Sequence, residues 1–394
     1  MTDLEALFRH GPPRRLAYFV RASRAPFVTP VPRVLLVLVI GWLPLFLLTL
    51  LTAPNELRDL FRDIAVHARY AVATPLLVVA YGSCGRRLGL IAGNFARAGL
   101  LDEHGKQVLK EQLAVSRQLL DLHVVEVATV MLAFAVAVAT LSGLTISEDL
   151  AAWTRDPGGK VLSLAGFWQF AISLPLLLTL LLGWLWRIGI WARLLLRLSR
   201  LDLNLIASHP DQCGGLGFLG QSLRAFSAFA MGLGTIAAGR LGHDHLLGTS
   251  TPFTDWLLAG GIVVVVAVLC VGPLCAFSGG MMQTWRWGSM AYGALATDLG
   301  TRLEATWLGR PVGAQVLDKD GAPRERPEIL EAPDFSAAAD LFTVTGGVQS
   351  MRFLPTDPRS IIVLGAATLL PFVAALLLTM PFSVVIETLK GLLV

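Results

Sequence analysis

Long apolar stretches are the feature that most constrains how this chain can fold. A helix needs about 20 mainly apolar residues to cross roughly 30 Å of hydrocarbon, and seven segments approach that length. These segments are 34–52, 70–83, 122–146, 162–186, 217–238, 256–277 and 360–386. Only 15% of the 394 residues are charged, whereas soluble proteins average about 25%. The sequence therefore predicts an all-α integral membrane protein with about seven transmembrane helices.

The lysines and arginines are distributed unevenly between the loops, and this asymmetry predicts an orientation. If the N-terminus is cytoplasmic, 24 of them fall in the cytoplasmic segments and seven on the opposite side; the cytoplasmic segments are 1–33, 84–121, 187–216 and 278–359. Positive charge collects on the cytoplasmic side of membrane proteins, so the C-terminus is expected on the opposite side. This topology accounts for the formal net charge of +4, with contacts to anionic lipids of the bilayer as an additional possibility, and no nucleic acid is expected as a partner.

Hydropathy and charge divide the chain into four segments. They are a basic cytoplasmic arm at 1–33, a six-helix membrane region at 34–280 with a cytoplasmic helical loop at 84–121, a cytoplasmic helix with a small hairpin segment at 281–355, and the last transmembrane helix with the C-terminus at 356–394. Residues 94–121 are expected to extend the third span, and 281–308 the sixth, as long cytoplasmic helices. The Asp320-Gly321 dipeptide predicts the hairpin turn. No internal repeat is evident.

The stretch 208–220 joins two spans and concentrates unusual polar chemistry. Its polar residues and glycines are His209, Asp211, Cys213, Gly214, Gly215, Gly217 and Gly220. Pro210 disfavours helix at the preceding residue, and the glycines allow positive φ or close backbone approach. We expect a turn held by side-chain-to-backbone hydrogen bonds from His209 and Asp211, followed by a helix start that could bind an anion. Three local donors are too few for a metal site, so no metal is assigned.

Arg224 is the arginine that lies furthest inside an apolar segment. It shares an i, i+4 stripe with the small residues Gly220, Ala228 and Gly232, and such stripes let membrane helices approach closely. Arg224 is therefore expected to face protein or water. Its expected partner is Glu126, one turn inside the third span, with His123 on the same face. Two interpretations remain open, a path for anions or protons and a structural ion pair that joins two helices.

A second polar group, His243-Asp244-His245, is expected in an outer loop. A metal site, a pH sensor and a tight polar turn are the alternatives for it. The four cysteines are too few and too scattered for a disulfide framework.

Two sequence elements resemble those of uncharacterised bacterial polytopic membrane proteins. The first is His209-Pro210-Asp211-x-x-Gly214-Gly215-Leu216-Gly217-Phe218-Leu219, which follows a leucine- and arginine-rich segment and precedes a span. The second is Asp357-Pro358-Arg359-Ser360, which leads into the last span. The resemblance covers the second half of the chain and implies a bacterial inner membrane. It implies no particular activity.

Three functions are compatible with these features. The first is a channel or transporter for a small ion or anionic solute, with a polar path near Arg224, Glu126 and His123. The alternative is a membrane-embedded scaffold or sensor that binds a cytoplasmic partner through residues 281–355. The third is an enzyme at the cytoplasmic face that uses His209 and Asp211. The sequence lacks a nucleotide-binding loop and a hydrolase motif, so no residue is assigned as catalytic and no cofactor is assigned. The sequence leaves a homo-oligomer open.

Overall fold

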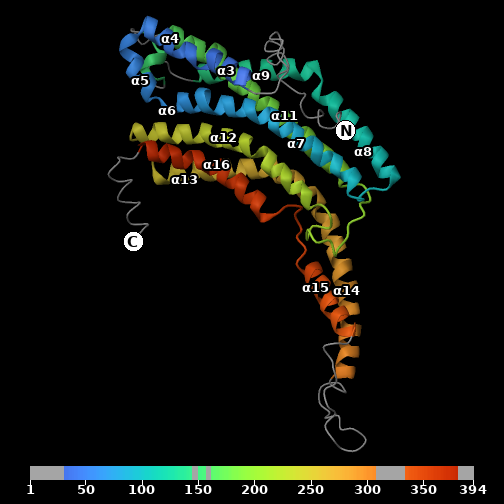
Figure 1. Cartoon of the computed structure of the whole chain (residues 1–394). Helices are drawn as coiled ribbons and strands as arrows, with labels where there is room; N and C mark the ends of the chain where they lie inside the picture. Colours follow the sequence, from blue (N-terminus) through green and yellow to red (C-terminus); the bar gives the residue numbers. More distant parts are fainter. Residues whose placement is uncertain (1–30, 144–149, 157–160, 308–332, 380–394) are drawn as a thin grey trace, which may run out of the picture.

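The computed structural model describes residues 31–143, 150–156, 161–307 and 333–379, and its regular structure is helical (Figure 1). Arg155 and Leu162 form an isolated antiparallel bridge, and the described residues contain no strand. The expected all-α class is therefore confirmed for this part of the chain. The hairpin predicted around Asp320-Gly321 lies outside the described residues.

Six helical segments are long and apolar enough to cross a membrane, so the chain has the character of a multi-pass membrane protein. They are Val31–Thr52 (α3 Val31–Gly41 and α4 Leu43–Thr52), Ile64–Arg97 (α6 Ile64–Val66, the π-helix η3 His67–Ala73 and α7 Thr74–Arg97), His123–Ser142 (α9), Leu164–Leu198 (α10 Leu164–Trp168, the π-helix η5 Gln169–Ser173 and α11 Leu174–Leu198), Pro252–Cys270 (α13) and Pro358–Thr379 (α16).

The other helices are shorter or more polar. They are η2 Pro54–Glu56, α5 Leu57–Arg62, α8 Glu103–Leu120, η4 Ala152–Thr154, η6 Gly217–Gly220, α12 Gln221–Leu246, η7 Gly272–Phe277, α14 Ser278–Trp307 and α15 Pro333–Gln349.

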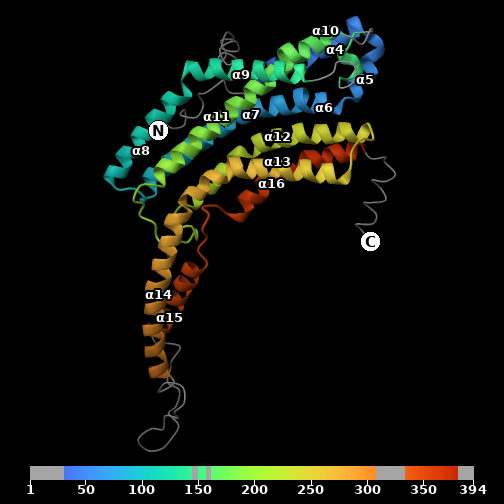
Figure 2. The same cartoon turned by 180° about the vertical axis from the view of Figure 1, so that it is seen from behind.

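The long helices run between the same two ends of a bundle (Figures 1 and 2). One end carries α8, residues 199–216 and the start of α14, and we call it the α8 end. The opposite end carries α5 and residues 247–251, and we call it the α5 end. Helix α12 lies inside the bundle, with α6 and α7 on one side and α13 and α16 on the other.

Helix α12 corresponds to the fifth predicted span, but its hydropathy is too low to place it among the six candidates. Its position explains the difference, because 14 of its 26 residues are buried against neighbouring helices. A helix that faces protein rather than lipid needs fewer apolar side chains. Glycine supplies the close contacts: Gly232 packs on Leu77 of α7, and Gly234 packs on the backbone of Thr368 in α16.

The predicted small-residue stripe does not face a single neighbouring helix. Gly220 lies against Thr356 and Asp357, just before α16, whereas Gly232 lies against α7. Gly220 at the end of η6 and Gly232 of α12 therefore serve two interfaces on different sides of this helical segment. The expectation of one continuous small-residue face was wrong because α12 is enclosed on more than one side.

Several predicted boundaries also change. The second and fourth spans are 34 and 35 residues long, so the helix of the fourth span continues through 187–198. Helix α8 does not extend the third span, because the backbone breaks at Leu122 (φ −67°, ψ 115°) between α8 and α9. The sixth span likewise ends at Cys270, and the 3₁₀-helix η7 separates it from α14.

The two longest candidate spans are related by an internal repeat that the sequence analysis missed. Ile64–Arg97 and Leu164–Leu198 align at an offset of 100 residues without gaps. Nine aligned positions are identical, namely Ala65, Ala71, Pro75, Leu76, Leu77, Arg87, Gly89, Ala92 and Arg97 with their counterparts at 165, 171, 175, 176, 177, 187, 189, 192 and 197. Each segment also has a π-helix that ends two residues before its proline. A π-helix widens the helix where proline would otherwise clash with a carbonyl.

Helices α14 and α15 pack on each other and extend away from the bundle at the α8 end (Figures 1 and 2). We call this pair the arm. Helix α14 has 30 residues, which correspond to about 45 Å at 1.5 Å per residue. Gly288 of α14 allows the close approach of Ala207 and Val348 at the base of the arm.

Candidate functional site

Asp211 organises the turn between α11 and α12. Its Oδ1 accepts hydrogen bonds from the N–H groups of Cys213 (2.8 Å) and Gly215 (3.1 Å), and its Oδ2 accepts one from Gly217 (2.8 Å). His209 Nδ1 lies 2.8 Å from the same Oδ1. The predicted structured turn is therefore confirmed.

The backbone of this turn needs its glycines. Gly214 and Gly215 have φ of 66° and 95°, and Gln212 also adopts a positive φ of 55°. Such values are unfavourable for most side chains. The left-handed residues turn successive N–H groups inward, where the Asp211 carboxylate accepts three of them.

Burial raises the pKa of the Asp211 carboxyl, but the N–H groups of Cys213, Gly217 and Gly215 lower it, and the net shift is downward. Asp211 therefore stays ionised at neutral pH. Its carboxylate accepts the Gly217 N–H at the start of η6. That group is thus satisfied within the chain, so the anion site expected at this helix start already holds an internal anion. A catalytic role for Asp211 loses support for the same reason.

The turn is joined to the segment that precedes α16. The N–H of Arg352 donates to the carbonyl of Gln212 (2.7 Å), and its Nη2 donates to the Gln212 side chain (3.2 Å). Cys213 Sγ contacts the carbonyl of Leu354 at 3.8 Å. The two conspicuous sequence elements, one at 209–219 and one at 357–360, therefore flank a single contact region.

A metal site is not formed at His209, Asp211 and Cys213. Burial and the adjacent Asp211 charge raise the pKa of the Cys213 thiol to about 11, so the thiolate that a metal requires is disfavoured. Within the described residues, no group of three or more His, Cys, Asp or Glu side chains is placed to hold a metal ion.

Arg224 lies one turn inside α12 and pairs with α16 rather than α9. Its Nη2 donates to Asp357 Oδ2 at 2.8 Å, and its Nε donates to Ser360 Oγ at 2.9 Å. The Ser360 hydroxyl in turn donates to Asp357. Burial raises the pKa of the Asp357 carboxyl, but the Ser360 hydroxyl and the Arg224 charge lower it, and the net shift is downward.

The prediction that Glu126 neutralises Arg224 was therefore wrong. Helix α9 packs on α11, whereas α12 packs on α7 and α16, and α6 and α7 lie between the two groups (Figure 1). The sequence contained a better partner in Asp357-Pro358-Arg359-Ser360, which is itself a conspicuous element. It was missed because 133 residues separate Asp357 from Arg224 along the chain.

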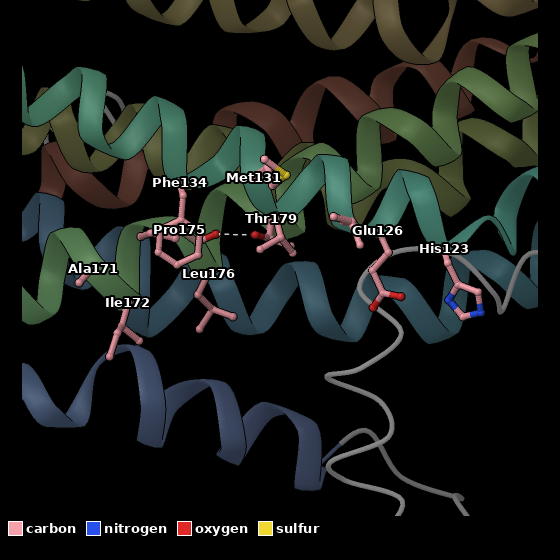
Figure 3. Close-up of a pocket in the computed structure, with 11 residues that line it drawn as sticks. His123, Glu126, Met131, Phe134, Ala171, Ile172, Pro175, Leu176 and Thr179 are labelled. Atoms are coloured by element: carbon pink, nitrogen blue, oxygen red, sulfur yellow. Dashed lines mark hydrogen bonds between the residues drawn. The ribbon is translucent and has the colours of Figure 1, made fainter.

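Glu126 and His123 line a separate pocket between α9 and the η5–α11 helix (Figure 3). Its volume is about 640 Å³, and most of its lining is apolar, with Phe134 and Leu176 among the larger side chains. Glu126 is buried and His123 is exposed. The two residues expected to share a face thus line one pocket, with the Thr179 hydroxyl further along it.

Sequence reasoning missed the most deeply buried cation in the described part of the chain. Arg187 has no exposed surface, although it was counted as a loop residue. Its guanidinium carbon lies 3.4 Å from the centre of the Tyr81 ring and 5.2 Å from that of Trp184, which is a cation–π arrangement. The internal repeat was the available signal, because it places Arg187 at the same helical position as Arg87.

The His243-Asp244-His245 group lies in the last turn of α12 and not in a loop. His245 Nε2 lies 2.9 Å from Asp255 Oδ2, and Asp244 pairs with Arg240. His243 Nδ1 lies 3.6 Å from Asp63 Oδ1. These contacts join α12 to the starts of α6 and α13 at the α5 end.

Fold and site together define a multi-pass helical membrane protein with an enclosed central helix and a helical arm at one end. Comparison with protein-family models, with curated proteins and with solved structures finds no match.

Proposed function

We propose that the chain is a membrane-embedded scaffold or sensor whose arm binds a cytoplasmic partner. The observation that carries the proposal is the arm itself, because α14 and α15 extend away from the bundle and expose large apolar side chains. Trp287, Met290 and Leu295 of α14 are 67%, 76% and 56% exposed, and Phe342 of α15 is 52% exposed. Exposed apolar groups of this size are typical of interaction surfaces.

The packing of α12 supports a structural role for the bundle over a path beside Arg224. A Cβ atom at Gly234 or Gly239 would overlap the neighbouring helix, so the interfaces along α12 are closely packed. Arg224 is held at the α8 end by Asp357 and Ser360. We therefore assign Arg224 to the α12–α16 contact.

The proposal includes an orientation. We infer that α12 is a seventh span and that the α8 end faces the cytoplasm of a bacterial cell, with the N-terminus cytoplasmic and the C-terminus periplasmic. The long helix α12 belongs to the same bundle as the six candidate spans and runs between the α8 end and the α5 end (Figures 1 and 2). The segments 84–121 and 187–216 hold six and four lysines and arginines, and their last parts, α8 and residues 199–216, lie at the α8 end.

Site-specific photo-crosslinking in cells tests the arm. A photoreactive residue at Met290 should give one discrete adduct with a second protein, whereas one at Leu247, which is 63% exposed at the α5 end, should not. Trp287→Glu, one helical turn away, should abolish the Met290 adduct without lowering the amount of protein in the membrane. The same adducts at both positions, or no adduct at Met290, would contradict the proposal.

A channel or transporter is the second candidate, and the pocket between α9 and α11 favours it. A buried carboxylate in a membrane segment is often part of an ion path, and Glu126 lies in this pocket with His123. Ion or solute flux into liposomes should then fall with Glu126→Gln and stay unchanged with Arg224→Gln. Flux that is absent, or that is equal in both variants and the wild type, would leave the scaffold as the better proposal.

A further inference from the structure

Two arginines from different helices meet on the surface at the α8 end. Arg87 of α7 donates from Nη1 to the backbone carbonyl of Arg224 in α12 at 3.5 Å. The Arg224 side chain is 45% exposed, and Arg87 is also exposed. Arg86, next to Arg87 in the chain, and Arg359, next to the Ser360 that Arg224 contacts, are exposed as well. We call these four residues the arginine patch.

The patch carries more positive charge than its protein surroundings balance. In the described part of the chain, Asp357 is the one carboxylate that contacts any of the four arginines, and it pairs with Arg224. Arg87 donates its hydrogen bond to a carbonyl oxygen, which leaves its charge without a carboxylate partner among the described residues. Exposed arginines whose charge is not balanced by carboxylates favour an additional anion beside them.

The patch lies at the starts of α12 and α16 and beside α7, at the α8 end of the bundle. Arg224 is in the first turn of α12, Asp357 directly precedes α16, and Ser360 is the third residue of α16. Arg87 is level with Arg224 because the two are hydrogen-bonded, and α7 continues ten residues further to Arg97. This is the depth at which a lipid phosphate would lie.

Apolar side chains continue the surface on the membrane side of the patch. Ile361 and Ile362 directly follow Arg359 and Ser360 in α16 and are 43% and 66% exposed. Val79, two turns before Arg87 on α7, is 37% exposed. A ligand that fits this surface has a phosphate at one end and a hydrocarbon chain at the other.

We propose that the arginine patch binds the headgroup phosphate of an anionic phospholipid. A guanidinium group matches a phosphate with two parallel hydrogen bonds, and basic surfaces between membrane helices are suited to anionic headgroups. Arg224 is already oriented by Asp357 and Ser360, which lowers the ordering cost of binding. Arg87 supplies the second guanidinium.

Native mass spectrometry of the detergent-solubilised full chain tests the proposal with phosphatidylglycerol and phosphatidylcholine added separately. The wild type should bind phosphatidylglycerol more tightly. Arg87→Gln should weaken that binding by about fivefold, because one arginine near a charged membrane surface contributes roughly that factor. Arg87→Lys keeps the charge but not the two parallel hydrogen bonds, so its affinity should lie between those of the wild type and Arg87→Gln.

Arg240→Gln is the matched control. Arg240 lies on α12 like Arg224 and pairs with an aspartate, Asp244, at the opposite end of the helix. This variant should bind phosphatidylglycerol as the wild type does. The melting temperature of each variant in detergent reports folding, and Arg87→Gln should match the wild type because, among the described residues, the Arg87 guanidinium makes a single long hydrogen bond.

Four results would overturn the proposal. One is equal affinity of the wild type for the two lipids, and another is unchanged phosphatidylglycerol affinity in Arg87→Gln. The third is displacement of phosphatidylglycerol by inorganic phosphate at equal concentration, which would identify the ligand as a free anion. Loss of lipid binding in Arg240→Gln to the same extent as in Arg87→Gln would likewise exclude a local site.

Discussion

Substitution of Gly234 by alanine tests whether α12 is the closely packed centre of the bundle. An added Cβ would lie 3.0 Å from the carbonyl carbon of Thr368 and 3.4 Å from its Cα, and still closer to its carbonyl oxygen. These are backbone atoms of α16 and cannot rotate away. Relief therefore requires α12 and α16 to separate along their whole contact.

The expected cost follows from two opposing effects. Overpacking a tight interface costs about 1–3 kcal/mol, and the reduced freedom of the unfolded chain offsets about 0.4–1 kcal/mol of it. We expect a net loss of roughly 1–2 kcal/mol, which lowers the folded-to-unfolded ratio by about five- to thirtyfold. Reversible unfolding in mixed micelles with increasing SDS measures this difference.

Gly365→Ala provides the matched control, because Gly365 belongs to α16 and a Cβ added there would meet no other atom within 4 Å. Helix propensity favours alanine over glycine by up to about 1 kcal/mol, so this variant should be as stable as the wild type or more stable. Opposite signs for the two substitutions would support the packing of α12. Equal stability of Gly234→Ala and Gly365→Ala would refute it.

Three further predictions concern charged residues. The pKa of the Asp211 carboxyl is lower in the folded state than its ordinary value of 3.8. Its contribution to stability is therefore complete above pH 3.8 and is lost as the pH falls from there through the folded-state pKa. Asp211→Asn should flatten the acid limb of a stability–pH curve. Arg187→Gln should destabilise the fold by about 2 kcal/mol through loss of the buried cation–π contact, measured by SDS unfolding with exposed Arg197→Gln as a neutral control. A double-mutant cycle of Arg224→Gln and Asp357→Asn should give a coupling free energy of at most about 1 kcal/mol because both side chains are partly exposed. A larger coupling would contradict the description of Arg224 and Asp357 as a partly exposed ion pair.

The membrane class and most span positions could be predicted because they depend on local composition. An apolar run of about 20 residues has few alternatives to a spanning helix, and six of the seven expected segments overlap a candidate span. Helix α12 differs because tertiary packing replaces lipid contact along its surface. Its glycines indicated close approach, but the sequence could not show which helices approach it.

The candidate site shows the same division between local and distant interactions. The Asp211 turn was predictable because proline, aspartate and glycine act on their own backbone. The pairing of Arg224 with Asp357 was not, since it depends on which helix packs beside α12. Likewise, Arg187 looked like a loop cation until α11 proved to continue to Leu198.

The internal repeat connects the buried arginine with the arginine patch. Arg87 and Arg187 occupy equivalent positions, and each reaches the next helix in the bundle: Arg187 of α11 stacks on Tyr81 of α7, and Arg87 of α7 bonds to the backbone of α12. Their surroundings differ, because Arg187 is fully buried and Arg87 is exposed. A change at Arg187 should therefore lower stability in any lipid, whereas a change at Arg87 should act only through anionic lipid. The same arginine position thus serves packing in one repeat and, by our proposal, lipid recognition in the other.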